Sequence, residues 1–400
     1  MEEDGIITMH DDLKVIRLEK GKLEEKEGET KEMHRKLGIP EAKELIKNKL
    51  RQKGLSAEEA EAVSEGEGVH IALLNSGIDE NHPGIEGKLA KEKGRNCVPW
   101  LCIGTKDEYT HLPDEHHDKN DISSKQVHGL SVGGIITNSR FGILRNAKLH
   151  VVKVCDDNRH GSQDTVLSGL GYIYSKRETL DLVNMSIGFR VYQPQTTARI
   201  FRSCERLAEE MMMVSAAGNE GYGPSIPSTS NCVISVGATC YSKTDPDYHT
   251  VCEFSNVWPT IDVTAPGKEI LCLDTKKPGE TDYRDAYGMM TGTSAATPII
   301  TSILGLAIAY IKKRNQLEGV QERVDCSDLE KRLKSTAHSD KIRPFGFDTT
   351  DEQIEDIFGR LYTFHLINTS LGAADFKRFA AGAGRVDAAE ILKSVIEDYD

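Results

Sequence analysis

Five short apolar runs between residues 70 and 238 constrain the fold of this 400-residue chain more than any other feature. Each run is rich in strand-forming residues, and helix-like stretches separate them. Strands that are apolar throughout are buried on both faces, and their alternation with helices is typical of a parallel α/β sheet. We therefore predict an α/β protein with a mostly parallel central sheet flanked by helices. The runs are HIALL (70–74), KLHVVKV (148–154), LDLVNMSIG (180–188), MMMVSAAG (211–218) and CVISVGA (232–238).

The N-terminal region, residues 1–66, differs in composition from the rest of the chain. Glu and Lys dominate from Leu18 to Glu67, and one amphipathic helix is expected around Pro40–Gln52. We interpret the region as a charged, partly helical and largely solvated extension. A regulatory or inhibitory prosegment that contacts the rest of the chain is the alternative.

Composition restricts the partners and the compartment. The net charge of -13 argues against nucleic acid or an anionic membrane surface as the main partner. No early basic stretch precedes an apolar run, and no segment is expected to span a bilayer, so we expect a cytoplasmic protein. The nine scattered cysteines favour buried or free thiols in a reducing compartment over a metal site, for which Cys97 and Cys102 are the closest pair.

Three polar residues lie at expected strand ends or helix starts, where ligands bind in parallel α/β sheets. Ser294 follows Gly292-Thr293 and precedes a long apolar helix, so its hydroxyl would lie near a helix N-terminus. His128 opens another apolar, small-residue segment and is a candidate general base. Asn219 in SAAGNEG (215–221) ends a strand, and its amide could donate to a developing oxyanion. Taken singly, the three have ordinary explanations as a helix cap, a surface or core histidine, and a turn residue.

The order Asn75, His128, Asn219 and Ser294, with these flanks, resembles the subtilisin-like serine proteases. The resemblance extends from Gly68 to Leu392 and implies a three-layer subtilisin-like fold. It includes NSRFGILRNAKLHVVKV (138–154), SIPSTSNCVISVGA (225–238), FSNVWPTIDVTAPG (254–267) and AGAGRVDAAEIL (381–392).

The resemblance also implies roles for individual residues. Ser294 would be the nucleophile, His128 its base, and Asn219 together with the Ser294 N–H group the oxyanion hole. Two short segments would pair with an extended peptide substrate as neighbouring strands. They consist of Ser186, Ile187 and Gly188, and of Ala216, Ala217 and Gly218; Phe189 is expected to narrow the substrate pocket.

Asn75 departs from the family, which has an aspartate at this position. That acid accepts the Nδ1–H of the histidine and stabilises the imidazolium. An amide lacks the charge, and if its NH₂ group faced the ring it would hold the histidine in the unproductive tautomer. Asp79 is expected to hold its own turn. The acids of DEHHDKND (114–121) could reach the site and replace the missing acid, although a solvated loop is the favoured interpretation. Deamidation at Asn75-Ser76 would restore an acid.

No cofactor is expected, and a metal is not expected either. Family members often bind calcium partly through an acid after the His-Pro pair, and Gly84 occupies that position here. The histidines within DEHHDKND could also bind a metal, although a solvated loop is the favoured interpretation.

The sequence thus predicts a subtilisin-like serine endopeptidase that forms an acyl-enzyme on Ser294, with activity reduced by Asn75. The alternative is a pseudoprotease that binds peptides or acts as a scaffold; an esterase or transpeptidase could use the same machinery. The expected partner is an extended peptide or protein. The expected organisation is an N-terminal extension (1–66), a peptidase domain (67–395) with an insertion around 338–380, and an acidic tail (396–400).

Overall fold

The computed structural model describes most of the chain and every residue of the expected catalytic set. The described ranges are 6–8, 14–102, 109–111, 117–189, 194–241, 249–277, 279–338, 342–343 and 381–399. Most of the insertion expected around 338–380 lies outside these ranges, as do residues 114–116 of the acidic run.

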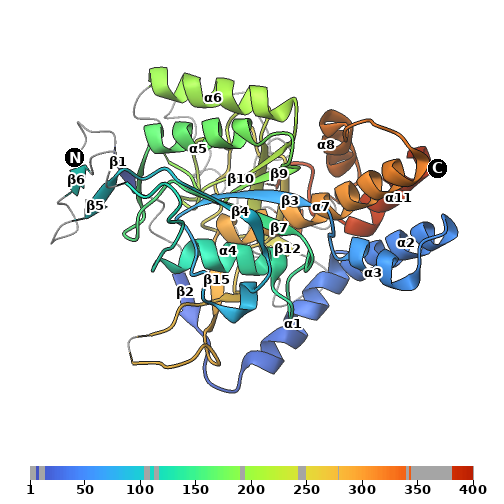
Figure 1. The fold of residues 1–400 in the computed structure, drawn as a ribbon, viewed down its shortest axis with the longest axis horizontal. Coiled ribbons are helices and arrows are strands. Elements are labelled where there is room, and N and C mark those ends of the chain that lie inside the picture. The colour runs from blue at the N-terminus through green and yellow to red at the C-terminus, as the bar shows by residue number, and fades with distance from the viewer. Residues whose placement is uncertain are drawn as a thin grey trace.

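A nine-stranded sheet forms the centre of the molecule (Figure 1). All pairs in it are parallel except the pair of β11 with β12, which confirms the predicted mostly parallel α/β fold. The strands follow the order β16 (Ile342–Arg343), β12 (His249–Val251), β11 (Ile234–Tyr241), β10 (Met212–Ala216), β9 (Leu182–Met185), β3 (His70–Asn75), β7 (Lys148–Lys153) and β4 (Leu89–Asn96), while β13 (Val263–Pro266) also pairs with β11.

Alternate residues of each central strand point to opposite faces of the sheet and join two different cores. In β3, Ile71 and Leu73 belong to the larger core, whereas Ala72 and Leu74 belong to the second one. The helices α4 (Val127–Thr137) and α7 (Thr293–Glu318) contribute to the larger core. The helices α5 (Gln163–Ser175) and α6 (Pro194–Ala208) cover the opposite face, so the sheet lies between two helical layers (Figure 1).

Helix α7 corrects one expectation from the sequence. Its 26 residues are long and apolar enough to cross a membrane, although we expected no such segment. The apolar window is entirely buried inside the protein, and residues from Thr293 to Ile311 line its core. The composition of α7 therefore fits a central core helix.

The N-terminal region is also more deeply packed than expected. It forms α1 (Leu23–Lys36), α2 (Ile39–Gln52) and α3 (Ala57–Ser64), of which α2 corresponds to the predicted amphipathic helix. Their apolar side chains join the larger core, where α2 and α3 pack with α7, α2 also packs with α11 (Ala388–Tyr399), and α1 packs with α2. The interpretation as a largely solvated extension is therefore wrong for this part, because one face of each helix is buried. The buried residues include Met33, Leu37, Ile46, Leu50 and Val63.

Two strands precede these helices and pair with separate parts of the molecule. Strand β1 (Ile6–Thr8) pairs antiparallel with β8 (His160–Ser162). Strand β2 (Lys14–Arg17) pairs antiparallel with β15 (Tyr287–Thr291), which leads directly into α7 and also pairs with β14 (Ile270–Leu273). The remaining elements are η1 (Pro83–Ile85), β5 (Trp100–Cys102), β6 (Tyr109–His111) and α8 (Cys326–Ser335).

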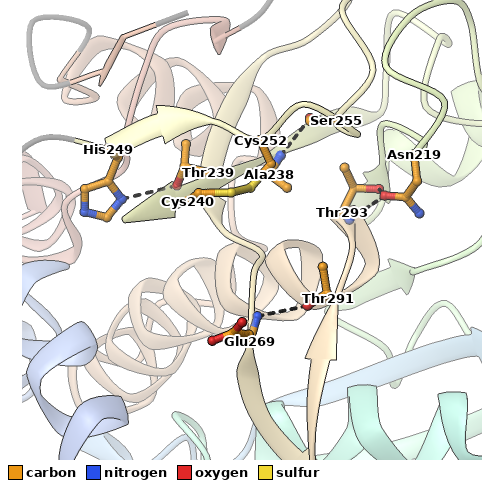
Figure 2. Close-up of a disulfide and its surroundings, with 10 residues drawn as sticks. All are labelled: Asn219, Ala238, Thr239, Cys240, His249, Cys252, Ser255, Glu269, Thr291 and Thr293. Atoms are coloured by element: carbon orange, nitrogen blue, oxygen red, sulfur yellow. Dashed lines mark hydrogen bonds between the residues drawn. A yellow bond between two sulfur atoms is a disulfide. The ribbon is translucent and has the colours of Figure 1, made fainter. Parts of the chain in front are cut away.

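A disulfide joins Cys240 at the end of β11 to Cys252, which directly follows β12 (Figure 2). This corrects the expectation that all cysteines would be thiols. The antiparallel pairing of the two strands brings the cysteines together, with Cys240 opposite Thr250. Among the cysteines whose side chains the structure describes, the remaining ones are free thiols: Cys97, Cys155, Cys204, Cys232, Cys272 and Cys326.

Candidate active site

The four expected catalytic residues come from four different elements at one edge of the sheet. Asn75 is the last residue of β3, His128 is the second residue of α4, and Ser294 is the second residue of α7. Asn219 lies in the turn after β10. All four are at most 3% exposed, so the site lies below the molecular surface.

Asn75 and His128 are in direct contact. The Asn75 Oδ1 atom lies 2.7 Å from His128 Nδ1, and it also accepts a hydrogen bond of 2.9 Å from the Ser76 main-chain N–H. Gly129 permits this approach of α4 to the β3 turn, because a Cβ atom at this position would lie 1.9 Å from the Gly77 carbonyl oxygen. The glycine therefore helps to place the imidazole against the amide.

Ser294 is held by the segment that follows β9. Its Oγ donates a 3.1 Å hydrogen bond to the Ser186 carbonyl oxygen, and Ser186 Oγ donates at 3.1 Å to the Ser294 carbonyl oxygen. The parallel register of β3 and β9 pairs Leu73 with Asn184, and two residues further along lie Asn75 and Ser186. The sheet thereby places the Asn75–His128 pair next to the strand end that holds Ser294.

Asn219 is tied to the residue before Ser294. Its Oδ1 accepts hydrogen bonds from the Thr293 main-chain N–H at 2.8 Å and from Thr293 Oγ1 at 3.1 Å. Figure 2 shows the amide oxygen turned towards Thr293 and the amide nitrogen pointing away from it. The turn needs glycine at position 218, where φ is +106° and a Cβ atom would lie 2.2 Å from Asn256 Nδ2.

Three buried polar atoms of the site have no hydrogen-bond partner among the described residues. They are His128 Nε2, Asn219 Nδ2 and Asn75 Nδ2. Ser294 Oγ donates to Ser186, so the expected Ser294–His128 hydrogen bond is not formed. Catalytic hydrogen bonds often form only when substrate is bound, and the role of each residue therefore stays a prediction. Buried polar atoms without partners are uncommon, and His128 Nε2 and Asn219 Nδ2 are the atoms that the resemblance implies as proton acceptor and oxyanion donor in acyl transfer.

The electrostatics of the site weaken its base. Burial, and to a smaller extent the positive charge of Arg159, lowers the pKa of His128 to about 3. Among the residues that the structure describes, no carboxylate raises the pKa in the opposite direction, and position 75 is an amide. His128 is therefore neutral at pH 7, and protonating it is unfavourable.

Three further residues support the site and were not predicted from the sequence: Asn184, Thr293 and Thr301. Asn184 donates at 2.9 Å to Ser186 Oγ and accepts at 2.9 Å from Thr301 Oγ1, so it joins β9 to α7. Thr293 connects Asn219 to the start of α7. The only signal in the sequence was the unusual position of Asn184 inside an apolar strand, where a buried amide requires polar partners.

In one of the two expected substrate segments, residues 216–218, main-chain groups already form hydrogen bonds within the protein. The N–H of Ala217 donates to the Val236 carbonyl oxygen at 3.0 Å, and that of Gly218 donates to Thr293 Oγ1 at 3.2 Å. Ala216 is paired within the sheet. The segment from Ser186 to Gly188 follows β9 directly, and Ser186 already contacts Ser294, the expected nucleophile. Phe189, expected to narrow the pocket, is buried in the second core.

The neighbouring acids serve local contacts. Asp79 Oδ2 accepts a 2.9 Å hydrogen bond from the Tyr283 hydroxyl. Asp118 and Asp121 accept hydrogen bonds from main-chain N–H groups two residues ahead in their own loop. None of these recorded contacts brings a carboxylate to His128, so no described acid replaces the missing charge.

The residues around Gly84 do not fit the calcium site that the resemblance suggests. The Asn138 amide donates a 3.1 Å hydrogen bond to the Gly84 carbonyl oxygen, and a Cβ atom at Gly84 would lie 2.7 Å from Asn138 Nδ2. A carboxylate could not be added at this position without displacing the amide. A direct hydrogen bond thus joins the two loops.

Comparisons with known proteins agree with this geometry. The model of the subtilase family (peptidase S8) matches residues 66–360. An intracellular serine protease of Paenibacillus polymyxa is 27% identical over 77% of this chain and 87% of its own length. The major intracellular serine protease of Bacillus subtilis is 29% identical over 62% of this chain and 70% of its own length. The crystal structure of a lanthipeptide protease has the same fold, with a TM-score of 0.56 at 18% identity over 82% of this chain and 89% of the other. The chain belongs to the subtilase family of serine peptidases.

Proposed function

We propose that the protein is a subtilisin-like serine endopeptidase in which Ser294, His128 and Asn219 carry out acyl transfer at a rate reduced by Asn75. The single observation that supports this most is the pair of unpartnered buried atoms, His128 Nε2 and Asn219 Nδ2, in a site whose serine lies at the start of α7. In a purely structural core, buried polar atoms such as these form hydrogen bonds within the protein. In a peptidase, His128 Nε2 would accept the serine proton and Asn219 Nδ2 would bind the carbonyl oxygen of the substrate.

Each residue has a defined part in the reaction. Ser294 Oγ attacks the carbonyl carbon of the peptide, and its proton moves to His128 Nε2. The negative charge that develops on the carbonyl oxygen is stabilised by Asn219 Nδ2 and the Ser294 N–H group. The C–N bond then breaks, His128 returns the proton to the departing amine, and water hydrolyses the resulting ester with the same base.

The missing charge at position 75 acts on the first of these steps. Proton transfer turns His128 into a cation, which burial and the charge of Arg159 both disfavour. An aspartate would stabilise this cation, whereas Asn75 supplies only a hydrogen bond. The amide therefore slows the reaction but leaves the nucleophile and the oxyanion donor in place.

The test is hydrolysis of an unfolded protein substrate, with the products identified by mass spectrometry. We expect slow cleavage at internal peptide bonds by the unmodified chain and its loss in the Ser294→Ala variant. A chain that binds peptides but produces no Ser294-dependent cleavage, even with Asn75→Asp, would instead be a pseudoprotease.

We further propose that the N-terminal strand is an intramolecular partner of the substrate groove. Strand β1 pairs antiparallel with β8, and β8 is connected to the surroundings of His128. Asp157, just before β8, accepts hydrogen bonds from Ser124 Oγ at 2.8 Å and from the Lys125 N–H at 3.1 Å. We propose that a substrate pairs with the edge of β8 in addition to the two segments named above, so that an extended segment on β8 would compete with it.

This contact is tested by deleting residues 1–13, which leaves β2 and its pairing with β15 intact. We expect the deletion to lower KM several-fold, because the strand edge of β8 becomes available. A synthetic peptide of residues 1–13 should inhibit the shortened chain, and a scrambled peptide should not. An unchanged KM would contradict the proposed competition.

The proposed location is the cytoplasm, which the names of the Paenibacillus and Bacillus relatives support. The disulfide between Cys240 and Cys252 is unusual for a reducing compartment. Cell fractionation combined with differential alkylation tests both points. We expect the protein in the cytosolic fraction, and recovery outside the cell with Cys240 and Cys252 fully oxidised would contradict this location.

A further inference from the structure

We infer that Ser76 is a positioning residue: its main-chain N–H fixes the Asn75 amide so that His128 keeps the tautomer that can accept a proton. This inference builds on the proposed function but concerns only the state of the imidazole. The question it answers is which end of the Asn75 amide faces the ring, since an amide can present either oxygen or NH₂.

The Ser76 N–H group determines the orientation of the amide. A main-chain N–H can only donate, so the atom that lies 2.9 Å from it is an oxygen. That same atom lies 2.7 Å from His128 Nδ1. If the amide were rotated by 180°, its NH₂ group would face the Ser76 N–H, donor against donor, and one hydrogen bond would be lost. The loss corresponds to a roughly tenfold preference for the observed orientation.

The orientation of the amide determines the tautomer of the ring. An oxygen at 2.7 Å accepts a hydrogen bond, so His128 Nδ1 must carry the proton. Burial lowers the pKa of His128 to about 3, and the ring is therefore neutral at pH 7 with a single N–H. The lone pair consequently lies on Nε2, which has no partner among the described residues.

The unpartnered Asn75 Nδ2 agrees with this assignment. In the observed orientation the amide oxygen accepts two strong hydrogen bonds, while the NH₂ group remains buried without a recorded partner. In the rotated orientation Nδ2 would donate to Nδ1, but the oxygen would lose the Ser76 donor. The weaker Ser76 Oγ contact, at 3.4 Å, does not decide the orientation, because a hydroxyl can donate or accept.

Nuclear magnetic resonance of the unmodified chain tests the tautomer without any substitution. The protein is labelled with ¹⁵N in its histidine rings, and ring protons are correlated with both nitrogens at pH 7. The His128 signals are those that disappear in His128→Gln. We expect a protonated Nδ1 and an unprotonated Nε2, with the same pattern in Asn75→Asp. An unprotonated Nδ1 with a protonated Nε2 in the unmodified chain would overturn the inference.

Two variants test the source of the preference. Asn75→Leu removes the acceptor and should leave a mixture of tautomers; an unchanged pattern would show that the amide does not set the tautomer. Ser76→Ala keeps the main-chain N–H and should leave the tautomer unchanged, whereas a switch in this variant would contradict the role of that N–H. The spectra do not depend on turnover, so a chain with the expected tautomer and no peptidase activity would refute only the proposed function.

Discussion

The two buried asparagines of the site have similar surroundings but different consequences. Asn75 is the last residue of β3, and Asn219 lies in the turn after β10. The amide oxygen of Asn75 accepts a hydrogen bond from the Ser76 main-chain N–H, and that of Asn219 accepts one from the Thr293 main-chain N–H. Each leaves a buried Nδ2 atom without a partner among the described residues. In Asn219 this free donor is what an oxyanion needs. In Asn75 it has no evident use, because the histidine already faces the oxygen.

The comparison separates two contributions that a triad aspartate normally makes together. One is geometric, since the residue orients the histidine and selects its tautomer; the other is its negative charge. Asn75 retains the geometry through its oxygen and lacks the charge. Ser294 and the Asn219 amide are both present in the other half of the site. We therefore attribute the reduced rate to the single negative charge that is missing at position 75.

The largest expected effect is that of removing the nucleophile. In subtilisin, loss of the serine costs about 10⁶ in kcat, and triad losses are not additive. Because the unmodified chain already lacks the charge, Ser294→Ala should cost only about 10³–10⁴ here and about 10⁶ after Asn75→Asp. Steady-state kinetics on one peptide with both backgrounds measures the two ratios. If Ser294→Ala lowered kcat by the same factor in both backgrounds, position 75 and Ser294 would act independently, which would contradict the proposal that residue 75 acts through His128 on the attack by Ser294.

Restoring the acid should have the next largest effect. A neighbouring opposite charge shifts a pKa by about 1–3 units, each corresponding to at most about tenfold in rate. Because the site is buried, we expect the upper part of this range, so Asn75→Asp should raise kcat about 10²–10³-fold. This is less than the roughly 10⁴ recorded for the reverse change in a chymotrypsin-type triad, where the amide imposes the wrong tautomer. The pH profile gives a second signature: the unmodified chain should be flat from pH 5 to 8, whereas Asn75→Asp should lose activity at the acid end.

Removal of the Asn219 side chain tests the proposed oxyanion donor, in the half of the site that retains the residues of the family. Asn219→Ala should lower kcat about 10²-fold with little change in KM, because Nδ2 interacts mainly with charge that develops in the transition state. Asn256→Ala is a matched control, since Asn256 lies after β12 and holds the same turn through its hydrogen bonds with Glu220, both of 2.8 Å, while the described residues show no hydrogen bond between Asn256 and Thr293. A similar loss in both variants would indicate a general disturbance of the turn.

The smallest expected effect concerns stability in acid. Burial, followed by the neighbouring His70, lowers the pKa of His150 to about 4, from an ordinary value of 6.5. The unfolded chain therefore binds more protons between pH 6.5 and 4, and stability should fall as the pH decreases through this range. At pH 5 the contribution of His150 to this loss is about 2 kcal/mol, and His34, His128 and His249, whose pKa values burial also lowers, add to it in the same direction. Urea unfolding at pH 7 and pH 5 measures it, and His150→Gln should reduce the difference.

The sheet and the family could be predicted because each central strand is apolar on both faces and ends at a recognisable polar residue. The amphipathic pattern of α2 could be predicted as well, but the packing of α1 and α3 could not, because their Glu-rich sequences contain only isolated buried apolar side chains such as Met33 and Val63. The pairing of Cys240 with Cys252 depends on a strand pairing that spacing alone does not reveal. The orientation of the Asn75 amide depends on a main-chain N–H, which every non-proline residue carries and which no sequence pattern marks.

The central claim is that the site is assembled and slowed, and a serine-directed fluorophosphonate probe tests it most directly. Intact mass and peptide mapping give the rate and position of labelling, and also show whether position 75 remains asparagine. The account predicts slow, stoichiometric labelling of Ser294 in the unmodified chain, about 10²–10³ times faster labelling in Asn75→Asp, and none in Ser294→Ala. No labelling of the unmodified chain, with rapid labelling only after Asn75→Asp, would contradict it.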